Sequence, residues 1–254
     1  MIEVAKKAAI EAGRVALSVR LSGITAKAKG GIGNFSTEGD LLAEKKIVDI
    51  ISKNFPNHGI LSEESVDSRK KSKYLWVIDP IDGTIIYYSG LDMFGVSVGL
   101  FRDNKPFLGA IYFPVLKLLF WAKRGEGAYL NDKKISVSPE KLLNKSVVGF
   151  DCGYSNRKAV IENILMPLVD NVCYTLMSGC AVFAMTNVAR GFCQANIHTG
   201  LIWDFAAASI IVEEAGGRVT DYRGKPIDWT KDWIDVVASN GLIHNEIIKL
   251  INKK

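Results

Sequence analysis

Cysteine and histidine are scarce in this chain of 254 residues, which has four cysteines and three histidines. No two cysteines form a Cys-x-x-Cys pair and no histidine stands at zinc-ligand spacing, so the pattern excludes the usual structural zinc site. The thiols lie in apolar surroundings, which predicts buried free cysteines in a reducing, cytoplasmic compartment. They are Cys152, Cys173, Cys180 and Cys193.

Long hydrophobic runs are also missing. No stretch reaches transmembrane length without charges or glycines. The N-terminal segment places apolar residues from Ala5 to Val19 at the 3.6-residue period of an amphipathic helix, between charged residues, rather than in the unbroken core of a signal peptide. The sequence therefore predicts a protein with no membrane partner.

Charge is not concentrated in long runs. The net charge of +5 is spread along the chain, with local clusters only at 69–73 and 253–254, and such clusters are typical of solvated loops and termini. Nucleic-acid binding is therefore not expected. Charged residues make up 23% and hydrophobic residues 48% of the chain, which is the composition of a globular protein with a substantial core.

The order of elements predicts two packed subdomains, 1–140 and 141–254, without a low-complexity linker. In the first, a polar loop at 26–39 precedes a helix at 40–54, whose start has the capping-box pattern Thr37 to Asp40. A buried strand follows at 74–78 and ends at Asp79-Pro80. Antiparallel strands are expected at 93–101, 107–112 and 118–122, with a hairpin at 129–135. In the second subdomain, strands at 147–150, 173–176, 192–197 and 236–239 alternate with helices at 157–169, 181–190, 204–215 and 242–251.

Four carboxylates stand at predicted element termini. They are Glu63 in Ser62-Glu63-Glu64-Ser65, Asp79 and Asp82 in Asp79-Pro80-Ile81-Asp82-Gly83-Thr84, and Asp204 in Trp203-Asp204-Phe205. Magnesium prefers oxygen ligands, usually one or two carboxylates per ion together with water and phosphate oxygens. The set therefore predicts a magnesium-dependent phosphatase site at the junction of the subdomains.

Each motif also has a purely structural interpretation. Asp-Pro-x-Asp-Gly is a common turn, Glu63 fits an exposed acidic corner, and Asp204 fits a helix N-terminus stabilised by the helix dipole. The occurrence of all three acidic motifs in one chain favours a functional site over three separate structural features. Gly83-Thr84 adds to it, because a helical turn beginning there can present backbone N–H groups to a phosphate.

These motifs, with Val212-Glu213-Glu214-Ala215-Gly216-Gly217, resemble the signatures of the inositol monophosphatase family. That family belongs to the lithium-sensitive, magnesium-dependent phosphatase superfamily that includes fructose-1,6-bisphosphatases. The resemblance covers nearly the whole chain. It implies an α+β fold, a layered α-β-α-β-α sandwich, and hydrolysis of a phosphomonoester by metal-activated water. It also implies a homodimer.

The resemblance assigns the site residues one by one. Glu63, Asp79 and the carbonyl of Ile81 would hold one Mg2+, and Asp79, Asp82 and Asp204 a second, near the leaving group. Two or three ions per site are implied, with Mn2+ as a substitute.

The other catalytic roles come from the same resemblance. Glu63 and Thr84 would activate water, and Asp40 would support Thr84 and a weaker third metal. The amides of Gly83 and Thr84 would bind phosphate, and Asp82 and Asp204 would also contact the substrate. Lys29 matches a basic residue, and Gly179 and Ala181 would line the alcohol pocket.

The sequence departs from the family pattern where substrate choice is made. Ile197 stands where a glutamate of classical inositol monophosphatases contacts inositol, and His198-Thr199 does not reproduce the Asp-x-Arg of members that cleave both inositol phosphate and fructose 1,6-bisphosphate. The substrate is therefore open between these two small esters. A 3′(2′),5′-bisphosphate nucleotidase and a non-catalytic scaffold with the same fold are the alternatives. His198 is interpreted as a structural residue in preference to a substrate contact, and Trp203 as a packing residue.

Overall fold

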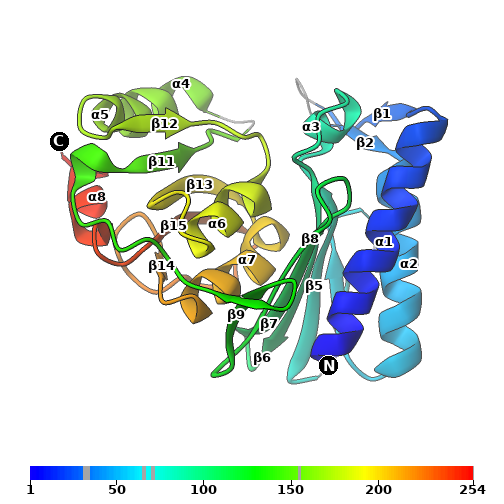
Figure 1. The fold of residues 1–254 in the computed structure, drawn as a ribbon. Coiled ribbons are helices and arrows are strands. Elements are labelled where there is room, and N and C mark those ends of the chain that lie inside the picture. Colours follow the sequence, from blue (N-terminus) through cyan, green and yellow to red (C-terminus); the bar gives the residue numbers. More distant parts are fainter. Residues whose placement is uncertain (31–34, 65–66, 70–71, 154–155, 254) are drawn as a thin grey trace.

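Five layers, in which helices and sheets alternate, make up the fold of this protein (Figure 1). The structure is a computed structural model and describes residues 1–30, 35–64, 67–69, 72–153 and 156–253. Its layers confirm the α+β sandwich expected from the sequence.

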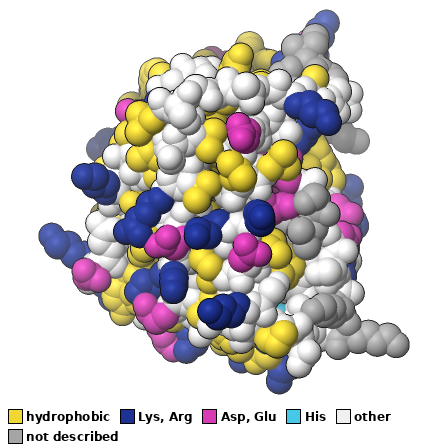
Figure 2. Space-filling view, turned by 90° about the vertical axis from the view of Figure 1, so that its right-hand side faces the viewer, with side chains coloured by type: hydrophobic (Ala, Val, Ile, Leu, Met, Phe, Trp, Pro, Cys, Tyr) yellow, Lys and Arg dark blue, Asp and Glu magenta, His cyan; other side chains and the backbone are white. Residues whose placement is uncertain are grey.

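The first layer is a pair of helices, α1 (Ile2–Ser22) and α2 (Glu38–Asn54). The alanine face of α1 is fully buried against the first sheet, and Gly13 allows the close approach, because a Cβ there would lie 2.7 Å from the ring of Tyr112. The capping box at Thr37 and Asp40 is confirmed. On the outer side of the two helices, lysine, arginine and acidic side chains are interspersed (Figure 2).

The second layer is an eight-stranded sheet in the order β10-β9-β8-β7-β6-β5-β3-β4. Its strands are β3 (Gly59–Ser62), β4 (Asp67–Ser68), β5 (Tyr74–Asp82), β6 (Gly95–Arg102), β7 (Lys105–Phe113), β8 (Leu118–Lys123), β9 (Gly127–Leu130) and β10 (Lys133–Ile135). The antiparallel meander from β5 to β10 is confirmed, whereas β3 was not anticipated and pairs with β5 in parallel.

The central layer holds α6 (Ala181–Ala189) and α7 (Ile202–Glu214), which pack between the two sheets. Helix α7 has almost no polar face because it is buried on both sides. It crosses closely over the first sheet at Gly109, where a Cβ would lie 2.6 Å from the carbonyl oxygen of Ala207. The short helix α3 (Thr84–Tyr88) begins directly after β5.

The fourth layer is a mixed sheet in the order β12-β11-β13-β15-β14. Its strands are β11 (Val147–Phe150), β12 (Tyr174–Leu176), β13 (Ala195–Leu201), β14 (Arg218–Thr220) and β15 (Trp233–Ser239), preceded by a 3-10 turn η1 (Leu143–Lys145). Helices α4 (Arg157–Val160), α5 (Met166–Val169) and α8 (His244–Ile251) cover its outer face.

Several expectations need correction. The segment 157–169 is not one α-helix, because a π-helical stretch η2 (Ile161–Leu165) separates α4 from α5, next to Pro167, which lacks the N–H of the α-helical ladder. The expected loop at 26–39 contains a hairpin of β1 (Ala26–Ala28) and β2 (Phe35–Thr37). Strand β14 was not anticipated. Cys173 is exposed, although the other three cysteines are buried.

Both sheets contribute to one apolar cluster around α6 and α7. The division into two subdomains at residue 140 stays a prediction, and two such subdomains would share this apolar cluster. Among the described residues, no helix has the length and apolar character needed to cross a bilayer.

Candidate active site

A cleft of about 460 Å3 is lined by residues of α3 from the first half of the chain and by the ends of β13 and β15 from the second. All four predicted carboxylates line it. So do five further residues assigned from the sequence, which are Ile81, Gly83, Thr84, Gly179 and Ala181. Its volume is within the range of small-molecule sites.

Strand β5 delivers the first two carboxylates. It does not end at Asp79, as the sequence suggested, but continues through Pro80 to Asp82, with a shift in its pairing to β6 between the two aspartates. The N–H of Ile81 donates to Oδ1 of Asp79 at 3.0 Å. This local irregularity brings Asp79, Asp82 and the carbonyl-bearing Ile81 to one end of the sheet.

The carboxylate of Asp82 is held by the start of α6. The N–H of Val182 donates to its Oδ2 at 2.5 Å, and the thiol of Cys180 donates to the same oxygen at 3.2 Å. Gly83 lies against Cys180, because a Cβ at Gly83 would be 2.9 Å from the Cβ of Cys180. The two halves of the chain are therefore joined at this aspartate.

Glu63 follows β3, and its N–H donates to the carbonyl of Ile78 at 3.2 Å. Lys29 reaches it from the first hairpin, with its Nζ 3.0 Å from Oε1 of Glu63 and 2.6 Å from Oε1 of Glu64. The N–H of Glu64 in turn donates to buried Glu44 at 3.0 Å. Ser65, the last residue of this motif, lies outside the described residues.

Asp204 is the third residue of α7. Its Oδ2 accepts from the N–H of Leu201 at 2.7 Å, which satisfies a backbone donor at the helix start. Gly200 is needed beside it, because a Cβ there would collide with Oδ2 of Asp204.

A hydroxyl and a buried carboxylate lie next to the metal motifs. Oγ1 of Thr84 is 3.1 Å from the carbonyl oxygen of Ile81 and 3.4 Å from Oδ1 of Asp40. Oδ2 of Asp40 accepts from the N–H of Thr37 at 2.7 Å and from its hydroxyl. A hydroxyl has one proton to donate, so Thr84 can bond only one of its two acceptors at a time.

Burial, together with repulsion from neighbouring carboxylates, raises the pKa values of four acids, Asp40, Asp79, Asp82 and Asp204. Burial raises the pKa of Asp79 well above its usual range, and Glu63 and Asp82 raise it further. The pKa of Asp204 is raised well above its usual value by burial and then by Asp82 and Glu63. Burial raises the pKa of Asp82 to about 6 against the lowering effect of the α6 donors, and that of Asp40 to about 6. Such repulsion requires proximity, so the acids share one site.

The ion pair at Lys29 offsets part of this repulsion. Burial alone would lower the pKa of its ammonium, but attraction to Glu63 and Glu64 outweighs burial and the net shift is upward. The ammonium therefore stays charged. Burial raises the pKa of Glu64 to about 7 in spite of its hydrogen bond to Lys29.

The residues fit a hard divalent cation by their chemistry. They supply buried carboxylate and carbonyl oxygens that repel one another, which is a donor set for Mg2+. Within the described ranges, no three histidine, cysteine or acidic side chains stand in ligating geometry as they are. The acids instead accept from Lys29, Val182 N–H and Leu201 N–H. A common ligand shell therefore stays a prediction.

Residues of the second half form the opposite wall of the cleft. Gly179, Ala181, His198 and Trp203 were named from the sequence, whereas Asp151, Cys152, Gly153, Arg157 and Trp233 were missed because they carry no motif. The same wall includes Thr199, Gly200 and Leu201. Gly179 and Ala181 lie where the family resemblance places an alcohol pocket. Trp203 packs against an apolar cluster, as expected from the sequence, and also lines the cleft.

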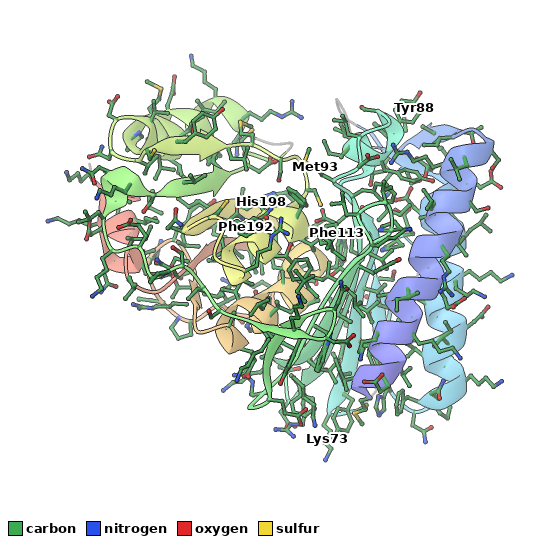
Figure 3. The ribbon with its side chains drawn as sticks, in the orientation of Figure 1. Lys73, Tyr88, Met93, Phe113, Phe192 and His198 are labelled. Carbon is green, nitrogen blue, oxygen red and sulfur yellow. The ribbon has the colours of Figure 1, made fainter. Side chains whose placement is uncertain are left out.

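The three histidines have different surroundings. His198 is on β13 of the second sheet (Figure 3), lines the cleft and meets the ring of Phe205 edge to face, with the ring centroids 5.3 Å apart. Burial lowers the pKa of His198, so it is neutral near pH 7. His58 accepts from the indole N–H of Trp76 at 3.1 Å, and His244 is buried at the start of α8, so neither lines the cleft. Ile197 is buried under the outer helices, away from it.

Comparison with known proteins gives consistent results. The sequence profile of the inositol monophosphatase family matches residues 1–254. A fructose-1,6-bisphosphatase/inositol-1-monophosphatase of Aquifex aeolicus is 33% identical over 261 residues, covering 99% of this chain and 95% of its own. The suhB extragenic suppressor protein of Bartonella henselae superposes with a TM-score of 0.93 at 30% identity, covering 99% and 98%. An IMPase/NADP phosphatase solved with Mg2+ and phosphate has a TM-score of 0.86 at 25% identity, covering 96% and 92%.

Proposed function

This chain belongs to the inositol monophosphatase family, a family of phosphoric monoester hydrolases, and from that premise we propose that it releases phosphate from a small phosphorylated polyol or sugar in a Mg2+-dependent reaction. Inositol 1-phosphate and fructose 1,6-bisphosphate are the substrates we propose. The single observation that carries the proposal is the lining of one cleft by Glu63, Asp79, Asp82 and Asp204, in which the charges of Glu63 and Asp82 add to burial in raising the pKa values of Asp79 and Asp204.

Mg2+ is proposed because the donor set is all oxygen and because a similar solved protein holds Mg2+ and phosphate. Glu63, Asp79 and the carbonyl of Ile81 would hold one ion, and Asp79, Asp82 and Asp204 a second. When bound, such ions lower the pKa of water and neutralise phosphate charge. A third ion near Asp40 and substitution by Mn2+ are part of the same proposal.

The chain's own groups would move the proton of the attacking water. In the structure, the hydroxyl of Thr84 is nearer to the carbonyl of Ile81 than to Asp40. If that carbonyl were a metal ligand, the hydroxyl of Thr84 would donate to Asp40 and accept from the attacking water, from which Glu63 would also accept. With a pKa of about 6, Asp40 is a competent base near neutral pH.

Binding of the ester would use both sides of the cleft. The amides of Gly83 and Thr84, at the start of α3, are proposed to bind the phosphate, and Asp82 and Asp204 to approach the leaving oxygen. Gly179 and Ala181 are proposed to line the alcohol. The homodimer implied by the family resemblance stays a prediction.

The test is phosphate release from inositol 1-phosphate, fructose 1,6-bisphosphate and adenosine 3′,5′-bisphosphate, each with Mg2+ and with chelator. We expect release from one of the first two, lost with chelator and restored by Mg2+. Preference for the adenine compound would instead assign the nucleotidase activity. Release that chelator does not affect would contradict the metal mechanism, and absence of release from every ester would favour the scaffold interpretation.

A further inference from the structure

A half-exposed tryptophan lines the cleft on the side of the second sheet. Trp233 is the first residue of β15, lines the cleft and keeps 46% of its surface exposed. We propose that Trp233 is a specificity-determining residue whose indole ring stacks on a ring in a neutral alcohol part of the substrate. The inference rests on the proposed function and narrows its substrate class.

The indole is fixed before any substrate binds. Its Nε1–H donates to Oγ1 of Thr199 at 3.1 Å, and Thr199 is 8% exposed in the centre of the sheet. A tryptophan with its N–H engaged and about half of its surface exposed to the cleft side is an ordered apolar platform. Stacking on it costs little conformational entropy, because the side chain is already ordered.

The sheet register places this platform at the leaving-group end of the site. Trp233 is the antiparallel partner of Leu201 across β13 and β15. Directly opposed residues have Cα atoms about 4.5–5.5 Å apart. The N–H of Leu201 is also the donor that holds Asp204. Trp233 therefore lies directly across from Leu201, the residue that holds Asp204, and Asp204 is the acid proposed to approach the leaving oxygen.

The charge of the cleft wall formed by the second half of the chain favours a substrate with a neutral alcohol part over one with a second phosphate. Among the described residues that line the cleft, Arg157 is the one lysine or arginine, and its Nε donates to the carbonyl of Gly153. The acidic Asp151 lines the same wall, and His198 is neutral because burial lowers its pKa. A second phosphate would bring about two negative charges to a wall whose charges roughly cancel.

The experiment compares a ring ester with an acyclic one that carries the same phosphate. Initial rates with Mg2+ are measured on inositol 1-phosphate, glycerol 2-phosphate and fructose 1,6-bisphosphate for the wild type, Trp233→Ala and Trp233→Phe. The matched control is Trp121→Ala, since Trp121 is also half-buried, donates its Nε1–H to the carbonyl of Asn131 at 2.9 Å, and does not line the cleft.

We expect Trp233→Ala to lower the ratio of kcat/KM for inositol 1-phosphate over glycerol 2-phosphate about tenfold, mainly through KM, as loss of one ring stack predicts. Trp233→Phe should restore most of that ratio, and Trp121→Ala should not change it. An unchanged ratio in Trp233→Ala, with an active wild type, overturns the stacking role. A wild type that prefers fructose 1,6-bisphosphate tenfold overturns the neutral alcohol. Failure of the proposed function gives a distinguishable result, because the wild type would then release no phosphate from any ester. That result would also overturn the inference about Trp233.

Discussion

The thiol of Cys180 lies 3.2 Å from Oδ2 of Asp82, across the junction between the two halves of the chain. The thiol is almost fully buried, and burial together with the charge of Asp82 raises its pKa well above the usual value. It therefore stays protonated and acts as a donor. With Val182 N–H, it holds Oδ2 of Asp82, a residue that lines the cleft.

Replacement of this thiol tests its role in orienting Asp82. Cys180→Ala should lower turnover about fivefold and raise the Mg2+ concentration needed for half-maximal rate, because a hydrogen bond to a charged acceptor is lost. Cys180→Ser should retain most activity, since a hydroxyl also donates. Rates against Mg2+ concentration check this. The control is Cys193→Ala, which removes a buried thiol outside the cleft and should leave the Mg2+ dependence unchanged. Equal effects of the two alanine variants would contradict orientation by Cys180.

Thr37 supports both a helix and the proposed base. Its side chain and backbone bond Asp40 in the capping box of α2. Thr37→Ala should lower the free energy of unfolding by about 1 kcal/mol, as for other N-cap losses. It should also lower turnover, because Asp40 is freed to rotate away from Thr84. Urea unfolding and phosphate release measure the two effects. Thr37→Ser retains the hydroxyl and should behave as the wild type, and a loss of stability in Thr37→Ser equal to that in Thr37→Ala would rule out the cap as the cause.

The stability of the metal-free protein should depend on pH in a defined direction. The pKa values of Asp79 and Asp204 are raised well above those of an unfolded chain, and that of Glu64 to about 7. The folded state therefore binds more protons than the unfolded state near neutral pH, and stability must fall as pH rises through the folded pKa values. In chelator, the midpoint of thermal unfolding should fall from pH 6.5 to pH 8.

The window from pH 6.5 to pH 8 is chosen because, below pH 6.5, the titration of His244 changes the stability of the protein in the opposite direction. Burial lowers the pKa of His244 to about 4, so its contribution to stability is lost as pH falls from 6.5 towards 4. Added Mg2+ should stabilise the protein most at pH 8, where the carboxylates are ionised. A thermal midpoint in chelator that is constant or rises between pH 6.5 and pH 8 would show that the acids are not destabilised by one another.

Motifs with strong local signals were predictable from the sequence. Residue type and spacing together marked three features, which are the apolar run of β5, the capping box of α2 and the three acidic motifs. The structure brings the four carboxylates of those motifs into one cleft. Strands β1 and β2 were missed because they are only three residues long and β1 is fully exposed, so no apolar alternation marks it. The end of β5 was misplaced because Pro80 usually ends a strand, whereas here the strand continues through an irregular pairing.

The wall that faces the acids could not be predicted in the same way. Trp233 begins β15, Asp151 directly follows β11, and neither carries a motif, so each reaches the cleft only through the order and register of the second sheet. Trp233 is opposed to Leu201 because β15 runs antiparallel to β13, a pairing between segments more than 30 residues apart. The make-up of this wall therefore depends on tertiary structure more than that of the acidic motifs does.

Replacement of Asp204 separates catalysis from folding. Asp204→Asn removes a charge that burial and Asp82 destabilise, while the amide oxygen can still accept from the N–H of Leu201. Turnover should fall at least about a hundredfold, as for loss of one essential electrostatic group, whereas the thermal midpoint in chelator at pH 8 should be equal to or above that of the wild type. Asp235→Asn is the matched control, because Asp235 is an exposed acid on β15 and should affect neither quantity. Phosphate release and thermal unfolding measured on the same samples decide the matter. If Asp204→Asn lost stability in proportion to activity, Asp204 would be a structural residue and the proposed second metal position would be wrong.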